Sequence, residues 1–334
     1  MTEIATKLVV VDPNSPEEQT MRSAADVIRR GGLVAFPTET VYGLGANALD
    51  ANAVERIFVA KGRPSANPLI VHVSDREIAK SLTSGWLQIA DQLTQHYWPG
   101  PLTLVLPKSP VVPDIVTAGG ATIAIRMPSH PIALGLIRES GVPLAAPSAN
   151  RSSQLSPTRA EHVLAGLNGR IDMILDGGPT QRGIESTVVD LTTDPPTLLR
   201  PGPITPAMLE AIVGPLQISS KQTSEGALRS PGLIAKHYSP RTPVEICPTI
   251  GALRASAERY HREGKRIGIL AIGSGNGDAI TMPADANDYA ARLYDALHSL
   301  DRSNLDRILI ELPPDTPEWL AVRDRLLRSA EPEA

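Results

Sequence analysis

In Leu33-Val-Ala-Phe-Pro-Thr-Glu-Thr-Val-Tyr-Gly-Leu-Gly45, a short apolar run stops at polar residues within a turn. The apolar part, residues 33–36, has the length and composition of a buried strand. The hydroxyl groups of Thr38 and Thr40 follow it and could bond to their own backbone. Gly43-Leu-Gly45 indicates instead that another group approaches the backbone closely. The glycines match neither a Walker loop nor a GxGxxG signature, so they do not name the ligand.

Further segments repeat this arrangement and add positive charge. They are Lys61-Gly-Arg-Pro64, Ser148-Ala-Asn150, Arg200-Pro-Gly202 and Arg126-Met-Pro128. Each has an ordinary explanation, such as a glycine helix cap with solvated cations or an Asx turn. Together they place cations and hydrogen-bond donors at strand and helix ends, as a polyphosphate ligand requires. The sequence therefore predicts an enzyme that handles a nucleotide.

The pattern of apolar residues predicts two domains. Strands are expected at 33–36, 69–73, 102–106, 122–127, 144–146, 172–175 and 187–191, and helices at 15–30, 50–62, 86–97, 130–139 and 158–167. Because these elements do not alternate cleanly, they favour a twisted mixed sheet with flanking helices. After residue 241, strands at 243–246, 266–272 and 307–312 alternate with helices at 249–263, 286–300 and 316–329, which predicts a smaller Rossmann-like α/β domain. The expected division is 1–213, a polar linker at 214–240, and 241–334.

Composition excludes several classes of protein. The chain of 334 residues has a net charge of -4 and a sequence pI of about 6.0, which argues against a protein that coats nucleic acid. No apolar stretch suits a membrane span, and no secretory signal is visible at the N-terminus. Cys247 is the single cysteine, so we expect a reducing, cytoplasmic setting and no cysteine-based zinc site. His72 lies in a predicted strand, where a lone histidine is more often structural than catalytic.

Seven segments, in their order and spacing, closely resemble the threonylcarbamoyl-AMP synthase family, the YrdC-like proteins. They are Pro37-Thr-Glu-Thr-Val-Tyr-Gly-Leu-Gly45, Lys61-Gly-Arg-Pro64, Pro99-Gly-Pro-Leu-Thr103, Ile125-Arg-Met-Pro128, Pro147-Ser-Ala-Asn150, Ser186-Thr-Val-Val-Asp190 and Arg200-Pro-Gly202. The resemblance covers residues 12–215. Ser230-Pro-Gly-Leu and Lys236-His-Tyr238 look like the linker of the family's long form, and 241–334 looks like its extra domain.

The resemblance implies that L-threonine, bicarbonate or CO2, and ATP give threonylcarbamoyl-AMP, pyrophosphate and water. Mg2+ would arrive with the triphosphate, with no metal site built from protein side chains alone. The product would pass to a threonylcarbamoyl transferase that forms t6A at position 37 of tRNA. Positioning and charge stabilisation are most of what such a transfer needs, which suits a chain without a nucleophile motif.

The same resemblance assigns site residues by position. It implies threonine binding by Thr40, His72, Arg126, Ala146 and Ser186. It implies ATP binding by Lys61, Arg63, Asn67, Thr122, Ser148, Asn150, Ser156, Arg200, His237 and Tyr238, with Lys61 and Arg63 also serving catalysis. Residues 214–240 are further expected to form a lid ordered by ATP or product.

Two alternatives belong to other classes. A basic concave surface could hold RNA, although the acidic pI and 3% aromatic content weigh against a single-strand-binding module. A carbamoyl-adenylate enzyme of the hydrogenase-maturation type shares this domain, but it carries zinc-finger cysteine pairs. One cysteine in the whole chain argues against that alternative.

Overall fold

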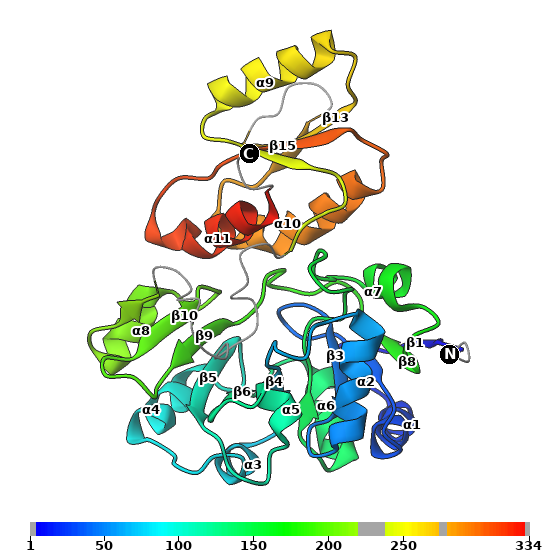
Figure 1. The fold of residues 1–334 in the computed structure, drawn as a ribbon, viewed down its shortest axis with the longest axis vertical. Coiled ribbons are helices and arrows are strands. Elements are labelled where there is room, and N and C mark those ends of the chain that lie inside the picture. The colour runs from blue at the N-terminus through cyan, green and yellow to red at the C-terminus, as the bar shows by residue number, and fades with distance from the viewer. Residues whose placement is uncertain (1–4, 220–237, 274–278, 331–334) are drawn as a thin grey trace.

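The computed structural model describes residues 5–219, 238–273 and 279–330. These residues form two units, each with its own sheet, that follow one another along the long axis of the molecule (Figure 1). The N-terminal unit holds eleven strands in the order β1-β8-β2-β3-β7-β4-β6-β5-β9-β10-β11. They are β1 (Lys7–Val10), β2 (Val34–Phe36), β3 (Gly43–Asn47), β4 (Ile70–His72), β5 (Leu102–Pro107), β6 (Thr122–Arg126), β7 (Leu144–Ala145), β8 (Met173–Asp176), β9 (Thr187–Asp190), β10 (Thr197–Arg200) and β11 (Gln217–Ile218). Parallel pairs such as β4–β6 alternate with antiparallel pairs such as β5–β6, which confirms the mixed sheet.

Helices pack around this sheet, and half of them begin at an N-cap residue whose side chain accepts a backbone N–H. They are α1 (Glu18–Arg29), α2 (Ala51–Lys61), α3 (Arg76–Ser81), α4 (Gln88–Tyr97), α5 (Asp114–Thr117), α6 (Pro131–Ser140), α7 (Ala160–Leu167) and α8 (Pro206–Val213). Asp50 caps α2 by accepting from the backbone N–H groups of Asn52 and Ala53, and Gly62 ends the helix at φ 61°. Helix α1 begins at Glu18, later than the expected start at residue 15, and its N-cap Glu17 makes no side-chain cap bond.

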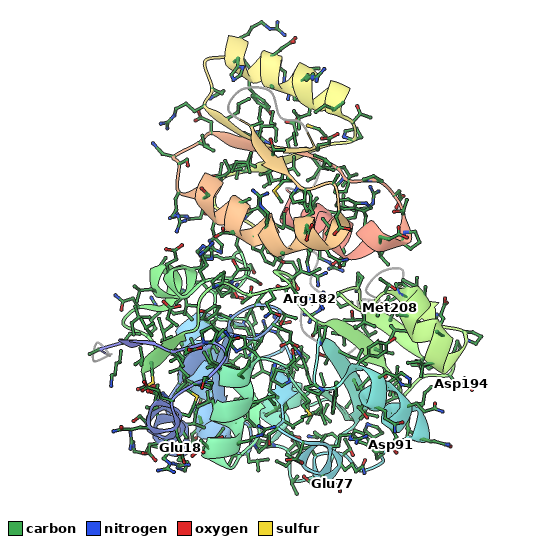
Figure 2. All side chains as sticks on the ribbon, turned by 180° about the vertical axis from the view of Figure 1, so that it is seen from behind. Glu18, Glu77, Asp91, Arg182, Asp194 and Met208 are labelled. Atoms are coloured by element: carbon green, nitrogen blue, oxygen red, sulfur yellow. The ribbon has the colours of Figure 1, made fainter. Side chains whose placement is uncertain are left out.

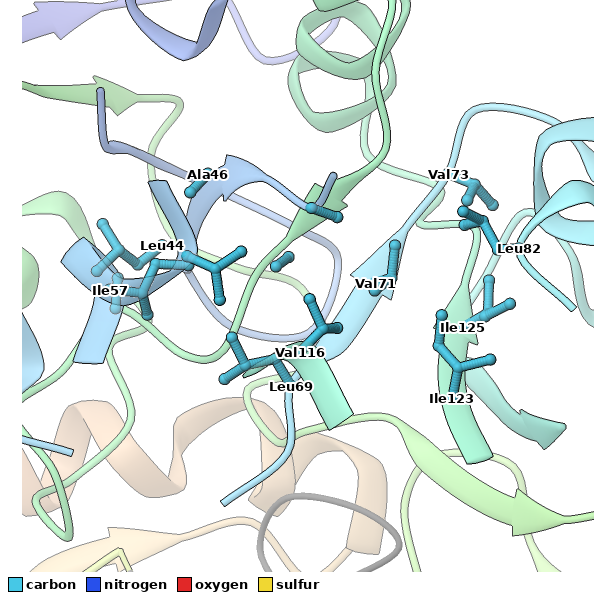
Figure 3. Packing of buried hydrophobic residues seen from close by; sticks show 14 of the residues in the cluster. Leu44, Ala46, Ile57, Leu69, Val71, Val73, Leu82, Val116, Ile123 and Ile125 are labelled. Atoms are coloured by element: carbon cyan, nitrogen blue, oxygen red, sulfur yellow. The ribbon is translucent and has the colours of Figure 1, made fainter. Parts of the chain in front are cut away.

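The larger buried cluster of this unit packs against α2, and another lies against α1 and α6. Figure 3 shows Leu44 and Ala46 of β3 close to Ile57 of α2, with Val71 of β4 and Ile125 of β6 further along the same cluster. All five side chains are fully buried. This apolar layer fixes the central strands, and the polar segments therefore extend from a rigid support.

Register brings the polar strand ends together. Parallel pairing of β4 with β6 sets His72 beside Arg126, and antiparallel pairing of β5 sets Thr103 opposite Arg126. The strand β3 was not expected, because its glycines indicated a turn. Gly45 is needed there because a Cβ would lie 2.7 Å from the Phe36 ring.

The C-terminal unit has four parallel strands in the order β12-β15-β13-β14. Its elements are β12 (Val244–Cys247), α9 (Ile250–Arg262), β13 (Ile267–Ile272), β14 (Ile280–Met282), α10 (Ala286–Asp301), β15 (Arg307–Glu311), the 3-10 helix Pro317–Trp319 and α11 (Leu320–Ser329). In Figure 1, α10 and α11 lie on the side toward the N-terminal unit and α9 lies on the far side. This arrangement agrees with the expected Rossmann-like fold.

Other elements depart from expectation. Strands β1, β10, β11 and β14 and helices α3, α5 and α8 were not predicted, because short segments carry too few residues to show a period. Residues 217–218 pair with β10, so the N-terminal sheet continues past the expected boundary at 213. Most of the expected linker and lid, including His237, lies outside the described residues. None of the helices in the described ranges has the length and apolar character needed to cross a bilayer.

Candidate active site

A cavity opens where the polar strand ends of the N-terminal unit converge, and we call it the substrate cavity. Its lining residues are Thr38, Thr40, Val41, Gly43, Arg63, Ile70, His72, Arg126, Ala146, Pro147, Ser148, Glu185, Ser186, Arg200 and Tyr238. The structure therefore gathers all five residues implied for threonine and four of those implied for ATP, namely Arg63, Ser148, Arg200 and Tyr238. Lys61, Asn67, Thr122, Asn150 and Ser156 are not among its lining residues.

Arg63 is a buried cation with spare hydrogen-bonding capacity. It is 8% exposed and donates from Nη2 to the Pro68 carbonyl at 3.2 Å. Its Nε has no hydrogen-bond partner among the described residues. Burial, with a smaller effect of Arg200, lowers the pKa of Arg63 to about 10, so the side chain is still charged at neutral pH. A buried cation with an unsatisfied donor at a cavity wall is suited to an anionic ligand.

Arg126 is held by a carboxylate that sequence analysis did not assign to the site. Its Nη2 lies 2.7 Å from Oε1 of Glu39, and both side chains are 4% exposed. The two atoms lack hydrogen-bond alignment, so the contact is chiefly electrostatic. Arg126 also donates from Nη1 to Oγ1 of Thr40 at 2.9 Å and from Nε to the carbonyl of Gly100 at 3.2 Å. Glu39 thus fixes the guanidinium against the cavity wall; its place between two threonines was the available signal.

Arg200 is aligned by the backbone and hydroxyl of Ser186. It donates from Nε to the Ser186 carbonyl and from Nη2 to Ser186 Oγ, each at 3.0 Å. Ser186 Oγ also lies 2.8 Å from Thr103 Oγ1 on β5. Gly202 permits this packing, because a Cβ there would lie 2.4 Å from the Thr187 nitrogen. In the Arg200-Pro-Gly202 segment, Gly202 therefore lets the chain pass close to the backbone of residues 185–187, where Ser186 orients Arg200.

His72 offers a neutral hydrogen-bonding group to the cavity. Its side chain is buried, and Nδ1 has no hydrogen-bond partner among the described residues. Burial, reinforced by the charge of Arg126, lowers the pKa of His72 to about 3. The imidazole is therefore uncharged at neutral pH and can orient a ligand without adding charge.

Lys61 acts on the cavity through a loop. From the end of α2 its Nζ donates to the carbonyls of Ser148 and Asn150, each at 2.5 Å. Burial, together with the charges of Arg63 and Arg151, lowers the pKa of Lys61 well below its usual value. The lysine therefore shapes the Ser148-Ala-Asn150 loop that borders the cavity, while its catalytic role stays a prediction.

Glu185 is the one carboxylate among the described lining residues. It accepts from Ser156 Oγ at 2.5 Å, from Tyr294 Oη at 3.2 Å and from Arg325 Nε at 2.7 Å. Ser156, implied for ATP, therefore bonds to this carboxylate in the structure. No sequence pattern could have paired Glu185 with Arg325, because they lie 140 residues apart.

A second cavity, of about 370 Å3, lies between the two units and has arginines in its wall. Its lining residues are Asn150, Arg151, Gln154, Leu155, His162, Ala165, Gly166, Arg170, Ser239, Arg241, His298, Asp301 and Arg302. Nearby, Glu161, His162 and Asp295 lie close enough to hold a metal ion. However, His162 Nδ1 accepts from the Thr158 N–H at 3.3 Å, which leaves the proton on Nε2, the atom facing the carboxylates. This tautomer opposes metal binding at these three residues.

Fold and site together define an α/β enzyme class with a buried, cation-lined cavity for an anionic substrate, and comparisons with known proteins agree. A family model described as "Telomere recombination", which covers Sua5, YciO and YrdC proteins, matches residues 26–202. A second, described as "Threonylcarbamoyl-AMP synthase, C-terminal domain", matches residues 204–331.

Full-length relatives give the same result. Threonylcarbamoyl-AMP synthase of Bacillus subtilis is 45% identical over 331 residues, covering 96% of each chain. That of Pyrococcus abyssi is 46% identical over 322 residues, covering 94% of this chain and 95% of its own. The crystal structure of P. abyssi Sua5 complexed with L-threonine is similar at 44% identity and a TM-score of 0.91, covering 98% of this chain and 100% of that one. The chain belongs to the threonylcarbamoyl-AMP synthase family, which confirms the resemblance found in its sequence.

Proposed function

We propose that this protein is an L-threonylcarbamoyladenylate synthase and that its substrate cavity holds L-threonine beside the α-phosphate of ATP. The observation that carries the proposal is the convergence of Arg63, Arg126 and Arg200, each at most 8% exposed, on one cavity. Three buried guanidinium groups suit a ligand with several negative charges. The related P. abyssi protein was crystallised with L-threonine.

The residues suit distinct parts of the two substrates. Arg126, oriented by Glu39, suits the threonine carboxylate, and the neutral His72 suits a polar group of the same amino acid. Arg63 and Arg200 suit the phosphates. Burial strengthens these interactions because the local dielectric is low.

The chemistry needs positioning more than a reactive side chain. The threonine amine adds to CO2 or dehydrated bicarbonate to form a carbamate. A carbamate oxygen then attacks the α-phosphorus, the bond to the bridging oxygen breaks, and pyrophosphate leaves. Arginines fixed around the phosphates stabilise the charge that moves to the leaving group.

Magnesium, bicarbonate and hand-over of the product complete the proposal. The only carboxylate among the described lining residues, Glu185, is already bonded to Ser156, Tyr294 and Arg325. We therefore expect Mg2+ to be held by ATP oxygens and water. Because a carbamoyl-adenylate is labile, we expect a transferase acting on tRNA to consume it. The single cysteine is consistent with the cytoplasm as the setting.

Mass spectrometry of product formed by the purified protein tests the function. With ATP, Mg2+, L-threonine and bicarbonate, we expect threonylcarbamoyl-AMP and an equal amount of pyrophosphate. Omission of either threonine or bicarbonate should stop both. Pyrophosphate released at the full rate without threonine would contradict the proposal.

A further inference from the structure

One guanidinium of the C-terminal unit is buried against the substrate cavity of the N-terminal unit. Arg325 lies on α11, which faces the N-terminal unit in Figure 1, and its side chain is fully buried. It donates from Nε to Glu185 at 2.7 Å and from Nη2 to the carbonyl of Pro201 at 3.0 Å. Its guanidinium carbon lies 5.2 Å from the ring centre of Tyr238. Arg325 therefore contacts three segments of the cavity wall at once.

Glu185 needs this partner in order to stay charged in the protein interior. It is 6% exposed, and the other described groups that donate to its carboxylate, the hydroxyls of Ser156 and Tyr294, are neutral. Arg200 adds a second positive charge nearby, but the ion pair at 2.7 Å is made by Arg325. A buried carboxylate that loses its ion-pair partner is strongly destabilised, so removing Arg325 would force the segment around Glu185 to rearrange or take up a proton.

The two anchor points lie next to two residues of the cavity. Glu185 directly precedes Ser186, and Pro201 directly follows Arg200. Ser186 in turn accepts two hydrogen bonds from Arg200. Arg325 thus holds the backbone on each side of the Arg200–Ser186 contact, at a distance of one residue from each.

We propose that Arg325 is a positioning residue of the active site, acting through Glu185 and Pro201 on Ser186 and Arg200. This inference depends on the proposed function, because it assigns a task to the C-terminal unit in the same reaction. The C-terminal unit then completes the substrate cavity from outside, without lining it in the described residues beyond Tyr238. The expected consequence is weaker threonine and nucleotide binding when the guanidinium is removed, even in folded protein.

Substitutions at two positions of the same helix separate positioning from general stability. Arg323 is the matched control, because its Nε pairs with Asp315 at 3.2 Å within the C-terminal unit. We expect Arg325→Met to weaken threonine binding, measured by calorimetry, and to lower kcat/KM by about 100-fold, the scale of a small misplacement of a reacting group. Arg325→Lys keeps a positive charge near Glu185 but lacks the second guanidinium nitrogen that reaches Pro201. Its threonine affinity and kcat/KM should therefore lie between those of wild type and Arg325→Met. Arg323→Met should bind and turn over as wild type does.

A double substitution tests the route through Glu185. If Arg325 acts by compensating this carboxylate, Glu185→Gln combined with Arg325→Met should bind threonine no more weakly than Arg325→Met alone. Additive losses would show that Arg325 does not act through Glu185 and would overturn the proposed route.

The outcome is decided even if Arg325→Met fails to fold. Tyr294→Phe removes one hydroxyl bond to Glu185 and should weaken threonine binding about 2- to 10-fold, the scale of a single hydrogen bond. Wild-type threonine affinity in folded Arg325→Lys and Tyr294→Phe proteins would overturn the inference. If wild-type protein itself neither binds threonine nor forms product, the proposed function is what fails, and the two failures are thereby distinguished.

Discussion

The two sheets of this protein differ in how they bury polar groups. In the N-terminal unit, arginines, two glutamates and the histidine His72 are buried near the ends of strands as short as two or three residues. In the C-terminal unit, the buried polar side chains among the described residues are Thr242, Arg325 and Ser329, and the interior is otherwise apolar or tyrosine. One unit buries charged groups around its cavity, whereas the other buries mainly apolar groups and places one cation, Arg325, against Glu185 of the cavity wall.

Several acidic side chains lie on the outer surface of the N-terminal unit. In Figure 2, Glu18, Glu77 and Asp91 lie on its outer edge, whereas Arg182 lies near the boundary with the C-terminal unit. The chain has a net charge of -4, but its acidic side chains are largely exposed to solvent whereas several of its cations are buried. Overall charge argued against a nucleic-acid coat, and it gave no sign of the cationic cavity.

The largest expected effect comes from breaking a buried pair of the N-terminal unit. Arg126→Met should lower the free energy of unfolding by about 3–5 kcal/mol, because it leaves the Glu39 carboxylate buried without a cation. Urea unfolding measures the change. Adding Glu39→Gln should recover part of it; a double variant as unstable as the sum of both singles would mean that the pair is not coupled.

Arg63→Ala should act on binding more than on folding. Within the described residues, its side chain makes one hydrogen bond, to the Pro68 carbonyl, so little of the fold depends on the guanidinium. We expect ATP binding to weaken by about 2–5 kcal/mol if the pair with phosphate is desolvated. Arg56→Ala, on the half-exposed part of α2 where Arg56 pairs with Asp172, is the calorimetric control. Unchanged ATP affinity in Arg63→Ala would remove this residue from the site.

The contact between the two units should depend on pH. Burial alone would raise the pKa of Glu185, but the charges of Arg325 and Arg200 and the hydrogen bonds from Ser156 and Arg325 hold it below its usual range. A carboxyl whose pKa is lower in the folded than in the unfolded protein, where it is about 4.3, stabilises the folded state. This stabilisation is fully present above the unfolded pKa and is lost as the pH falls through the folded pKa. The difference in unfolding free energy between wild type and Glu185→Gln should therefore be greatest near neutral pH and shrink below about pH 4. A difference that grew on acidification would contradict this.

The smallest effect is expected on the outer helix of the C-terminal unit. Arg259 pairs with Glu245 at 3.1 Å, and its side chain is 50% exposed. Arg259→Met should change the unfolding free energy by about 0–1 kcal/mol, as for other solvated pairs, and leave kcat/KM unchanged. A loss comparable to that of Arg126→Met would mean that the two units are not as different as their burial indicates.

Local chemistry explains which elements the sequence predicted. Helix α2, with Asp50 at one end and Gly62 at the other, was foreseen because its cap and its stop are both local. Strands β3 and β11 were missed because glycine spacing and a two-residue pairing leave no periodic signal. The extent of each domain stays a prediction, since β11 continues the first sheet into the expected linker.

The cavity residues also differ in how far the sequence indicated their roles. The sequence indicated the arginines at positions 63, 126 and 200 because each follows an apolar run. The fold places all three at one cavity. Lys61 looked equivalent to them, but tertiary packing turned its ammonium group toward two backbone carbonyls.

By itself, the order of residues determined the family, the mixed sheet and the segments that carry charge, because these depend on periodicity, caps and short motifs. Tertiary structure alone decided the partners of the buried charges, Glu39 with Arg126 and Glu185 with Arg325. The reason is physical: ion pairing acts through space in a low-dielectric interior, and nothing in the local sequence encodes a contact across 140 residues.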